Sequence, residues 1–211
     1  NVEFFKEFGR TNPTLPLKVA GKIVHGNACR VDWESVCPKK DDYEIYILGN
    51  PPYQGFKNQD KQQKSDLAHI LKGIKGYKSL DFISCWFVMA SRYIENGIKS
   101  AFVSTNSICQ GSQVETLWPI ILNNNIEIGF GFTPFKWSNS AKKNAGVTCV
   151  IIGLRENSTE DKLLFDGSRA KKVENINPYL IEGDNIIVNN RRSSLSNLPE
   201  ISDGCGALDG G

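Results

Sequence analysis

The stretch "EIYILGNPPYQGF", residues 44–56, ends an apolar run with groups that could activate an aromatic amine. Asn50 offers an amide oxygen and Pro51 a backbone carbonyl, which Pro51 and Pro52 hold rigidly because proline fixes φ and lacks an N–H. An exocyclic amine on a base is a poor nucleophile because its lone pair is delocalised into the ring. Two preorganised acceptors would localise that pair, and Tyr53 offers a stacking face worth roughly 1–3 kcal/mol. The stretch therefore predicts chemistry that needs no acid, metal or covalent nucleophile.

The same four residues could instead form only a rigid turn after a strand. A second apolar run, "GKIVHGN" at residues 21–27, ends in the same Gly-Asn pair, with Asn27 last. In open α/β sheets, ligands bind at the carboxyl ends of the strands. Two such strand ends side by side would form one composite crevice, which favours a binding function for Asn50 and Asn27.

Strand-like and helix-like patterns alternate through the first 156 residues. The segment 79–97 carries apolar residues at helical spacing, with Ser79 as a possible N-cap and Gly97 as a stop. This alternation predicts an α/β fold with a mostly parallel sheet and helices on both faces. The last two strands have no helix between them and should form an antiparallel hairpin at the sheet edge. The predicted strands are 21–27, 43–50, 99–105, 126–132 and 146–154, and the predicted helices are 79–97 and 113–124.

Beyond residue 156 the sequence becomes polar and rich in turn residues. Only "NIIVNN", residues 185–190, suggests a short strand there. We therefore predict two regions: 1–156, part of a catalytic domain, and 157–211, a linker that opens into another domain.

Composition excludes several classes of protein. The net charge of +2 permits a nucleic-acid partner without requiring one, and no apolar run reaches the roughly 20 residues of a membrane span. The six cysteines are scattered, and with two histidines they complete no metal spacing. We expect a cytoplasmic protein without disulfides or metal. The start, without methionine or signal peptide, predicts a fragment of a longer polypeptide.

The segment "LGNPPYQG" resembles motif IV of the N6-adenine DNA methyltransferases, whose pattern is Asp/Asn-Pro-Pro followed by an aromatic residue. Three further segments resemble one subgroup, the large methylases in which modification, DNA recognition and often restriction share one polypeptide. The resemblance runs in the right order over nearly the whole chain. These segments are "HGNACRVDWESVCP", "FKWSNSAKKNAGVTCVIIGL" and "NINPYLIEGDNIIV".

The resemblance implies a partial Rossmann-like sheet, the S-adenosylmethionine-dependent methyltransferase fold. It also implies methyl transfer from S-adenosylmethionine to the N6 amine of an adenine flipped out of double-stranded DNA. In that reaction Asn50 and Pro51 would accept hydrogen bonds from the amine. Pro52 would complete the motif and Tyr53 would stack on the base.

Cofactor contacts follow from the same resemblance. Asn27, with its neighbour Ala28, matches the position, usually acidic, that holds the cofactor adenine, and Asn50 would border the same molecule. Phe82 and Trp86 match apolar contacts to that adenine. Asn27 could instead be a plain turn asparagine, and the two aromatic residues could be ordinary core residues.

Two aromatic residues in the predicted loop before the last strand, Phe135 and Trp137, resemble the aromatic that helps hold the flipped base. Nearby cations could contact phosphates or could simply keep this edge soluble. These cations are Lys136, Lys142, Lys143 and Arg155.

One departure from the family matters. Its glycine-rich cofactor loop and an acidic residue for the cofactor ribose should precede Asn27, yet residues 1–22 contain neither. We therefore expect that both this cofactor-loop region and the C-terminal recognition region are missing, and that the isolated chain is inactive. Two alternatives remain open: a protein-glutamine methyltransferase, which uses the same motif, and a non-catalytic DNA-binding module with this fold.

Overall fold

The computed structural model describes residues 21–40, 43–137 and 147–191. The chain divides into two compact units, residues 1–39 and 40–211, and each is described by itself. In the first unit, helix α2 (Trp33–Val36) begins where the Asp32 carboxylate accepts a hydrogen bond from the Glu34 amide. The predicted strand 21–27 is not formed, and Ile23 is 94% exposed. A strand needs a hydrogen-bonded neighbour, which this segment lacks among the described residues.

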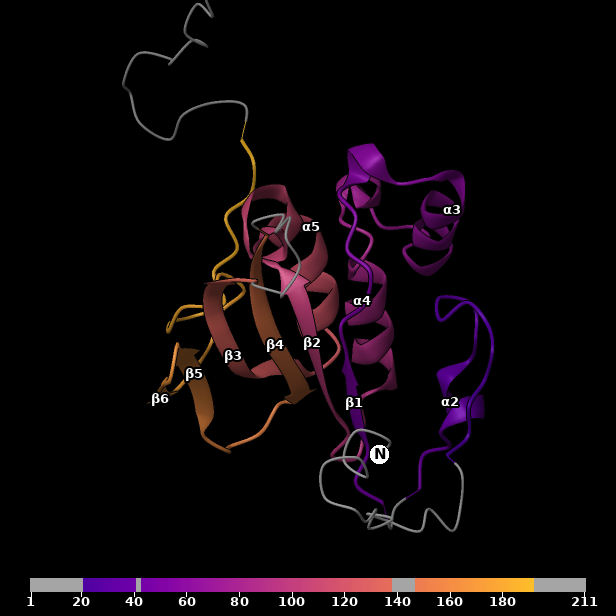
Figure 1. Ribbon diagram of the computed structural model, residues 1–211. Coiled ribbons are helices and arrows are strands. Elements are labelled where there is room, and N and C mark those ends of the chain that lie inside the picture. The colour runs from indigo at the N-terminus through magenta and orange to yellow at the C-terminus, as the bar shows by residue number, and fades with distance from the viewer. Residues whose placement is uncertain (1–20, 41–42, 138–146, 192–211) are drawn as a thin grey trace, which may run out of the picture. The chain divides into compact units, whose positions relative to one another are not determined.

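The second unit is built on a six-stranded sheet with the order β1-β2-β4-β3-β5-β6 (Figure 1). The pairs β1–β2 and β3–β5 are parallel, and the other three pairs are antiparallel. The sheet is therefore mixed rather than mostly parallel. Its strands are β1 (Tyr46–Gly49), β2 (Lys99–Thr105), β3 (Ile126–Lys136), β4 (Thr148–Glu156), β5 (Lys162–Asp166) and β6 (Arg169–Val173).

The antiparallel β3–β4 hairpin was predicted and is confirmed, but it does not lie at the sheet edge. Strands β5 and β6 extend the sheet past β3, within residues that the sequence assigned to a linker. The reason is visible in β6, where four of five residues are exposed, so it carries almost no apolar pattern. The assignment of residues 157–211 to the start of a recognition segment stays a prediction.

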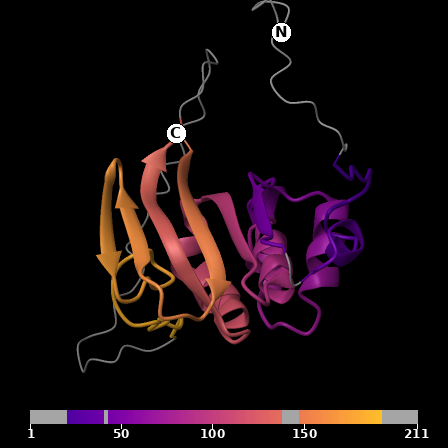
Figure 2. The same cartoon turned by 90° about the horizontal axis from the view of Figure 1, so that it is seen from below.

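Helices α4 (Ser84–Tyr93) and α5 (Gly111–Leu122) pack on one face of the sheet (Figures 1 and 2). Phe87 of α4 touches both Phe102 of β2 and Trp118 of α5, with ring centroids 5.3 and 6.3 Å apart. All three rings are essentially fully buried. This aromatic cluster is the centre of the core, and it fixes β2 beneath the two helices.

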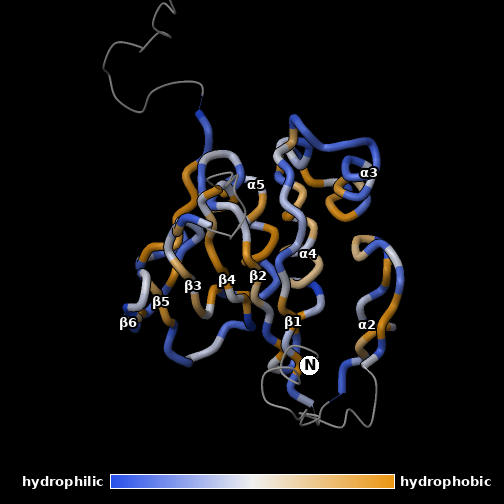
Figure 3. The backbone as a smooth tube through the Cα atoms, in the orientation of Figure 1, coloured by the Kyte–Doolittle hydropathy of each residue, from blue (hydrophilic) through white to orange (hydrophobic). Residues whose placement is uncertain are grey.

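Two helices differ from the predicted ones, and a third was not predicted. Helix α4 spans Ser84–Tyr93 rather than the predicted 79–97. Helix α5 spans Gly111–Leu122 rather than the predicted 113–124, and Pro119 lies inside it. Helix α3 (Lys61–Ile70), which packs against α4, begins with a capping box formed by Asp60 and Gln63. It carries mostly polar residues, unlike α5 (Figure 3). Short 3-10 turns occupy η1 (Phe56–Asn58), η2 (Tyr77–Ser79) and η3 (Asn106–Cys109).

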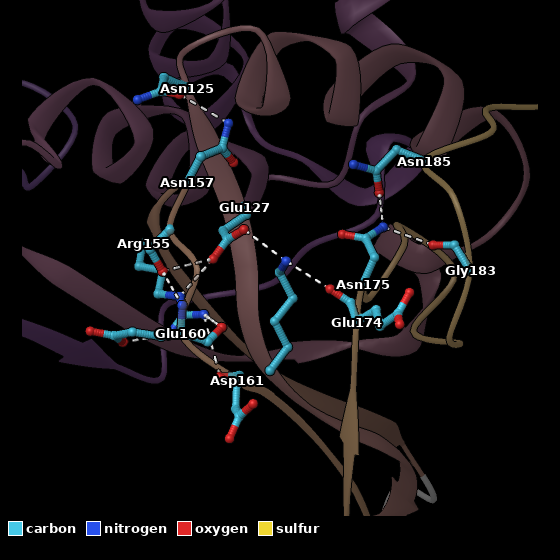
Figure 4. Close-up of polar contacts among 12 residues, drawn as sticks. Asn125, Glu127, Arg155, Asn157, Glu160, Asp161, Glu174, Asn175, Gly183 and Asn185 are labelled. Atoms are coloured by element: carbon cyan, nitrogen blue, oxygen red, sulfur yellow. Dashed lines mark hydrogen bonds and ion pairs between the residues drawn. The ribbon is translucent and has the colours of Figure 1, made fainter.

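A buried ion cluster joins β3, β4 and β5 at one end of the sheet (Figure 4). The Glu127 carboxylate pairs with Arg155 Nε at 2.8 Å and with Lys162 Nζ at 2.9 Å. Arg155 also binds the Glu160 carboxylate at 2.6 Å. The guanidinium of Arg155 is thus engaged in ion pairs within the sheet, which does not favour its use as a phosphate contact; that contact stays a prediction.

After β6 the chain forms a compact turn around Asn175 and Asn177. Asn175 Nδ2 donates to the Gly183 carbonyl at 2.7 Å, and the Asn177 side chain accepts from the Tyr179 amide at 3.0 Å. The predicted strand 185–190 is extended but unpaired. Its Val188 amide donates to the Tyr179 hydroxyl, and its Asn190 amide to the Glu115 carboxylate, so side chains take the place of a strand partner.

None of the helices in the described part of the chain has the length and apolarity needed to cross a bilayer.

Candidate active site

The motif Asn50–Tyr53 follows β1 directly at its carboxyl end. β1 stops pairing with β2 at Gly49, because Pro51 and Pro52 have no N–H to continue the ladder. The Pro51 ring is buried, whereas Asn50 and Pro52 are exposed. Within the described residues, neither the side-chain amide of Asn50 nor the backbone carbonyl of Pro51 makes a hydrogen bond. Two acceptors are thus available at the end of this strand.

The Tyr53 ring is half-buried, and its hydroxyl lies near the Cys149 thiol, close enough for the two groups to affect each other's pKa. Burial is the main cause that raises the pKa of Tyr53, and the Cys149 sulfur raises it further. Burial also raises the pKa of Cys149, while the bond from Tyr53 acts in the opposite direction. Both groups therefore stay neutral, with the thiol beside the tyrosine hydroxyl. Nothing in the sequence had indicated a role for Cys149.

The sheet brings Phe135 close to the same place. Cys149 is the β4 residue opposite Phe135 of β3, so Tyr53 and Phe135 flank one thiol. Phe135 lies in a strand rather than in the predicted loop. Trp137, whose backbone amide bonds the Val147 carbonyl at 3.0 Å, stands at the base of the connection and is 37% exposed. The two rings are 6.4 Å apart and tilted by 40°.

The predicted cofactor aromatics lie at the start of α4. Phe82 precedes the helix and is buried, while Trp86 in its first turn is half-buried. Their rings meet edge to face, with centroids 5.2 Å apart. The structure thus brings the pair together, with Trp86 as the more accessible ring.

A buried carboxylate, Asp81, connects this helix start to the residue that follows Tyr53. Its Oδ1 accepts from the Gln54 amide at 2.9 Å and from the Ile83 amide at 3.1 Å. Burial raises the pKa of Asp81, and the Ile83 and Gln54 N–H bonds oppose that rise. Asp81 therefore holds the turn that leads into α4, whose N-cap residue Ile83 has no side-chain cap. Ser79, the predicted cap, does not cap α4, and its hydroxyl instead donates to the Gly76 carbonyl.

Asn27 and Ala28 belong to the first unit, residues 1–39. The Asn27 side-chain oxygen accepts from the Cys29 amide at 2.9 Å, and its carbonyl accepts from Arg30 and Val31. This is a tight asparagine turn. The composite crevice of Asn27 and Asn50 stays a prediction.

Other predicted contacts lie elsewhere. Lys136 is exposed beside Trp137, whereas Lys142 and Lys143 lie outside the described residues. Among the described residues, no group of three or more His, Cys, Asp or Glu side chains could hold a metal ion. A hollow of about 450 Å³ opens elsewhere on the sheet, with Phe130, Gly153 and Phe165 in its lining. Of the residues singled out in the sequence, it includes Arg155 and none of the predicted catalytic, cofactor or base contacts. The site is therefore defined by strand ends rather than by this hollow.

The sequence and the fold are matched by known proteins. The MmeI DNA-methyltransferase domain family matches residues 1–166 of the chain. The chain belongs to this family. The match confirms the resemblance to DNA methyltransferases, and it reaches β5, beyond the predicted boundary at residue 156.

Two relatives extend this result. DNA methyltransferase A of Bacillus subtilis (strain 168) is 46% identical over 201 residues, which cover 94% of this chain and 23% of that protein. The type IIL restriction-modification enzyme MmeI, whose structure was solved in complex with DNA, is 38% identical with a TM-score of 0.81. That match covers 94% of this chain and 27% of the enzyme. The chain thus spans about a quarter of the length of both relatives.

Proposed function

We propose that the chain is the part of a DNA methyltransferase that holds a flipped adenine and prepares its N6 amine for methylation. One observation carries this proposal: the Asn50 amide and the Pro51 carbonyl lie at the carboxyl end of β1 without hydrogen-bond partners among the described residues. Two acceptors at that place suit the two hydrogens of an adenine amine. The family and the DNA complex of a relative favour double-stranded DNA as the partner.

Each residue has a separate role in this proposal. Asn50 and Pro51 accept the two amine hydrogens and localise the nitrogen lone pair, and Pro52 keeps the backbone rigid. The Tyr53 ring stacks on the base, with its hydroxyl turned toward neighbouring Cys149. Phe135 and Trp137 supply the second aromatic side of the base pocket.

The residues fit S-adenosylmethionine in part. Trp86 presents an accessible ring beside Phe82, which suits a cofactor adenine, and Asn27, Ala28 and Asn50 could supply polar contacts. When bound, S-adenosylmethionine supplies the methyl group. Residues 1–22 lack a glycine-rich loop, so the 211-residue chain alone should bind it very weakly and be inactive. Calorimetric titration measures this directly, and micromolar affinity would mean that the cofactor site is misplaced.

The decisive experiment follows labelled methyl transfer to duplex DNA by the protein at its full natural length. Asn50→Ala should remove most transfer but leave DNA binding nearly intact, because this acceptor acts mainly in the transition state. Asn157→Ala is a matched control, since that exposed amide bonds only Asn125 among the described residues. Mapping should place the label on adenine N6.

Three results would contradict the proposal. Near wild-type turnover in Asn50→Ala would remove the assigned role. Label on a glutamine side chain would point to the protein-glutamine methyltransferase reaction. DNA binding without any transfer would point to a non-catalytic module.

A further inference from the structure

The connection between the motif and helix α4 is unusually well braced, and the chemistry assigned above leaves it without a role. Its centre is Asp81, which is only 5% exposed and is followed at once by Phe82. We call Asp81 and the two residues whose amides it binds, Gln54 and Ile83, the Asp81 clamp.

The clamp joins two segments 27 positions apart in the sequence. On one side, Asp81 Oδ1 accepts a hydrogen bond from the backbone amide of Gln54, the residue directly after Tyr53. On the other side, the same oxygen accepts a hydrogen bond from the backbone amide of Ile83, just before α4. A third bond, from the Phe82 amide to the Gln54 carbonyl at 3.0 Å, ties the segments again. The backbone that follows Tyr53 is therefore fixed to α4 through both its N–H and its C=O.

Two glutamine side chains keep the clamp in register. Gln59, also buried, donates from its amide nitrogen to the Gln54 carbonyl and to the Leu80 carbonyl, both at 2.9 Å. Gln113 of α5 accepts from the Asp81 amide at 3.0 Å and donates to the Ser79 carbonyl at 2.7 Å. Each amide thus spans two elements, and the carboxylate cannot shift without breaking several bonds.

We infer that Asp81 is a positioning residue for methyl transfer, holding Asn50–Tyr53 and the Phe82–Trp86 pair in one fixed geometry. The motif has no regular secondary structure of its own, since β1 ends at Gly49 and the two prolines donate no hydrogen bonds. Its downstream end is therefore held by Gln54. A displacement of about 1 Å in a reacting group can lower a rate by about 100-fold. This inference rests on the proposed function.

The test compares four variants of the protein at its full natural length. Asp81→Ala removes the acceptor, and Asp81→Asn keeps an oxygen that can accept both amides. Asp60→Ala is the matched control, because the Asp60 carboxylate also accepts a backbone amide at a helix start, Gln63 at 2.8 Å, but it caps α3. Gln113→Leu loosens the clamp without changing Asp81, and it replaces Asp81→Ala if that variant does not fold.

Two measurements are made on each variant. The first is the single-turnover rate of methyl transfer from S-adenosylmethionine to duplex DNA, with both saturating. Asp81→Ala should lower it about 10–100-fold while KM for DNA changes little, and Asp81→Asn should restore most of the rate. Gln113→Leu should give a smaller loss, and Asp60→Ala should match the wild type. The second is hydrogen exchange of the Gln54 amide, which should become faster in Asp81→Ala and Gln113→Leu only.

Several outcomes would overturn the inference. If Asp81→Ala keeps the rate of Asp60→Ala, Asp81 only stabilises the fold. If Asp81→Asn loses as much rate as Asp81→Ala, hydrogen-bond acceptance is not what matters. If the wild type transfers no methyl group to DNA, the proposed function fails, and hydrogen exchange alone decides: unchanged Gln54 exchange in Asp81→Ala would then show that there is no clamp.

Discussion

The ion cluster around Glu127 allows a quantitative test of how the sheet is held together. Replacing Glu127 by glutamine keeps its shape but removes the one carboxylate that pairs with both Arg155 and Lys162. All three side chains are nearly buried, with 8% of Glu127 and 11% of each cation exposed. Breaking a buried pair by removing one partner typically costs about 3–5 kcal/mol, because the remaining charge is left without compensation.

Replacing Glu127 by glutamine should not cost Arg155 and Lys162 the same amount of stabilisation. Arg155 keeps the Glu160 carboxylate at 2.6 Å and the Glu160 carbonyl at 2.7 Å. Among the described residues, Lys162 keeps only the Glu174 carbonyl at 2.9 Å. Most of the penalty therefore falls on Lys162, and we expect Glu127→Gln to lower the free energy of unfolding by about 3 kcal/mol.

Urea unfolding of the 211-residue chain, followed by tryptophan fluorescence, measures this loss, since Trp118 is fully buried in the core. Adding Lys162→Met to Glu127→Gln should recover part of it, with a coupling energy of about 1–3 kcal/mol. Glu182→Gln, which breaks the exposed pair with Lys171, is the control and should cost under about 1 kcal/mol. A loss below about 1 kcal/mol for Glu127→Gln, or strict additivity with Lys162→Met, would refute the reasoning.

Three further predictions concern the site and the sheet. In the folded protein the pKa of Asp81 is raised above 3.8. The free energy of unfolding of the wild type should therefore fall relative to that of Asp81→Asn as pH rises from 3.8 through the raised pKa. A difference between the two proteins in urea unfolding that does not change with pH would contradict this. Gly153→Val should destabilise by about 1–3 kcal/mol in the same assay, since a Cβ there would lie 2.1 Å from the Phe130 ring, and adding Phe130→Ala should relieve part of the loss. Trp137→Ala and Phe135→Ala should each weaken capture of the extruded adenine by roughly 1–3 kcal/mol, reported by 2-aminopurine fluorescence in full-length protein, with partial rescue by a mismatch opposite the target. Unchanged extrusion in both variants would make these rings structural.

Local patterns predicted the core of the sheet well. Strand β2 has the predicted bounds, because its residues alternate between buried and half-buried positions. The motif Asn50–Tyr53 could be placed at a strand end from another local signal, because proline stops a ladder at a defined residue. Both inferences use only neighbouring residues.

The remaining features depend on contacts between distant residues, which local patterns do not show. The proximity of Tyr53 to Cys149 and the Asp81 clamp each link different elements, so neither leaves a periodic signal. Strand β6 escaped prediction because an exposed edge strand resembles a loop. The apolar "GKIVHGN" run misled in the opposite direction, since hydrophobicity alone does not form a strand without a partner.

The manner in which residues 185–190 are attached has a consequence for local stability. Side chains hold this segment one amide at a time, Val188 through Tyr179 and Asn190 through Glu115, whereas a strand is held by a continuous ladder. Ile186 and Val188 are each 69% exposed, so opening the segment uncovers little new apolar surface. Its opening free energy should therefore be far below that of the sheet, and it should open as an independent unit. Limited proteolysis should cut here first, at a rate that responds to Tyr179→Phe but not to substitutions in the ion cluster.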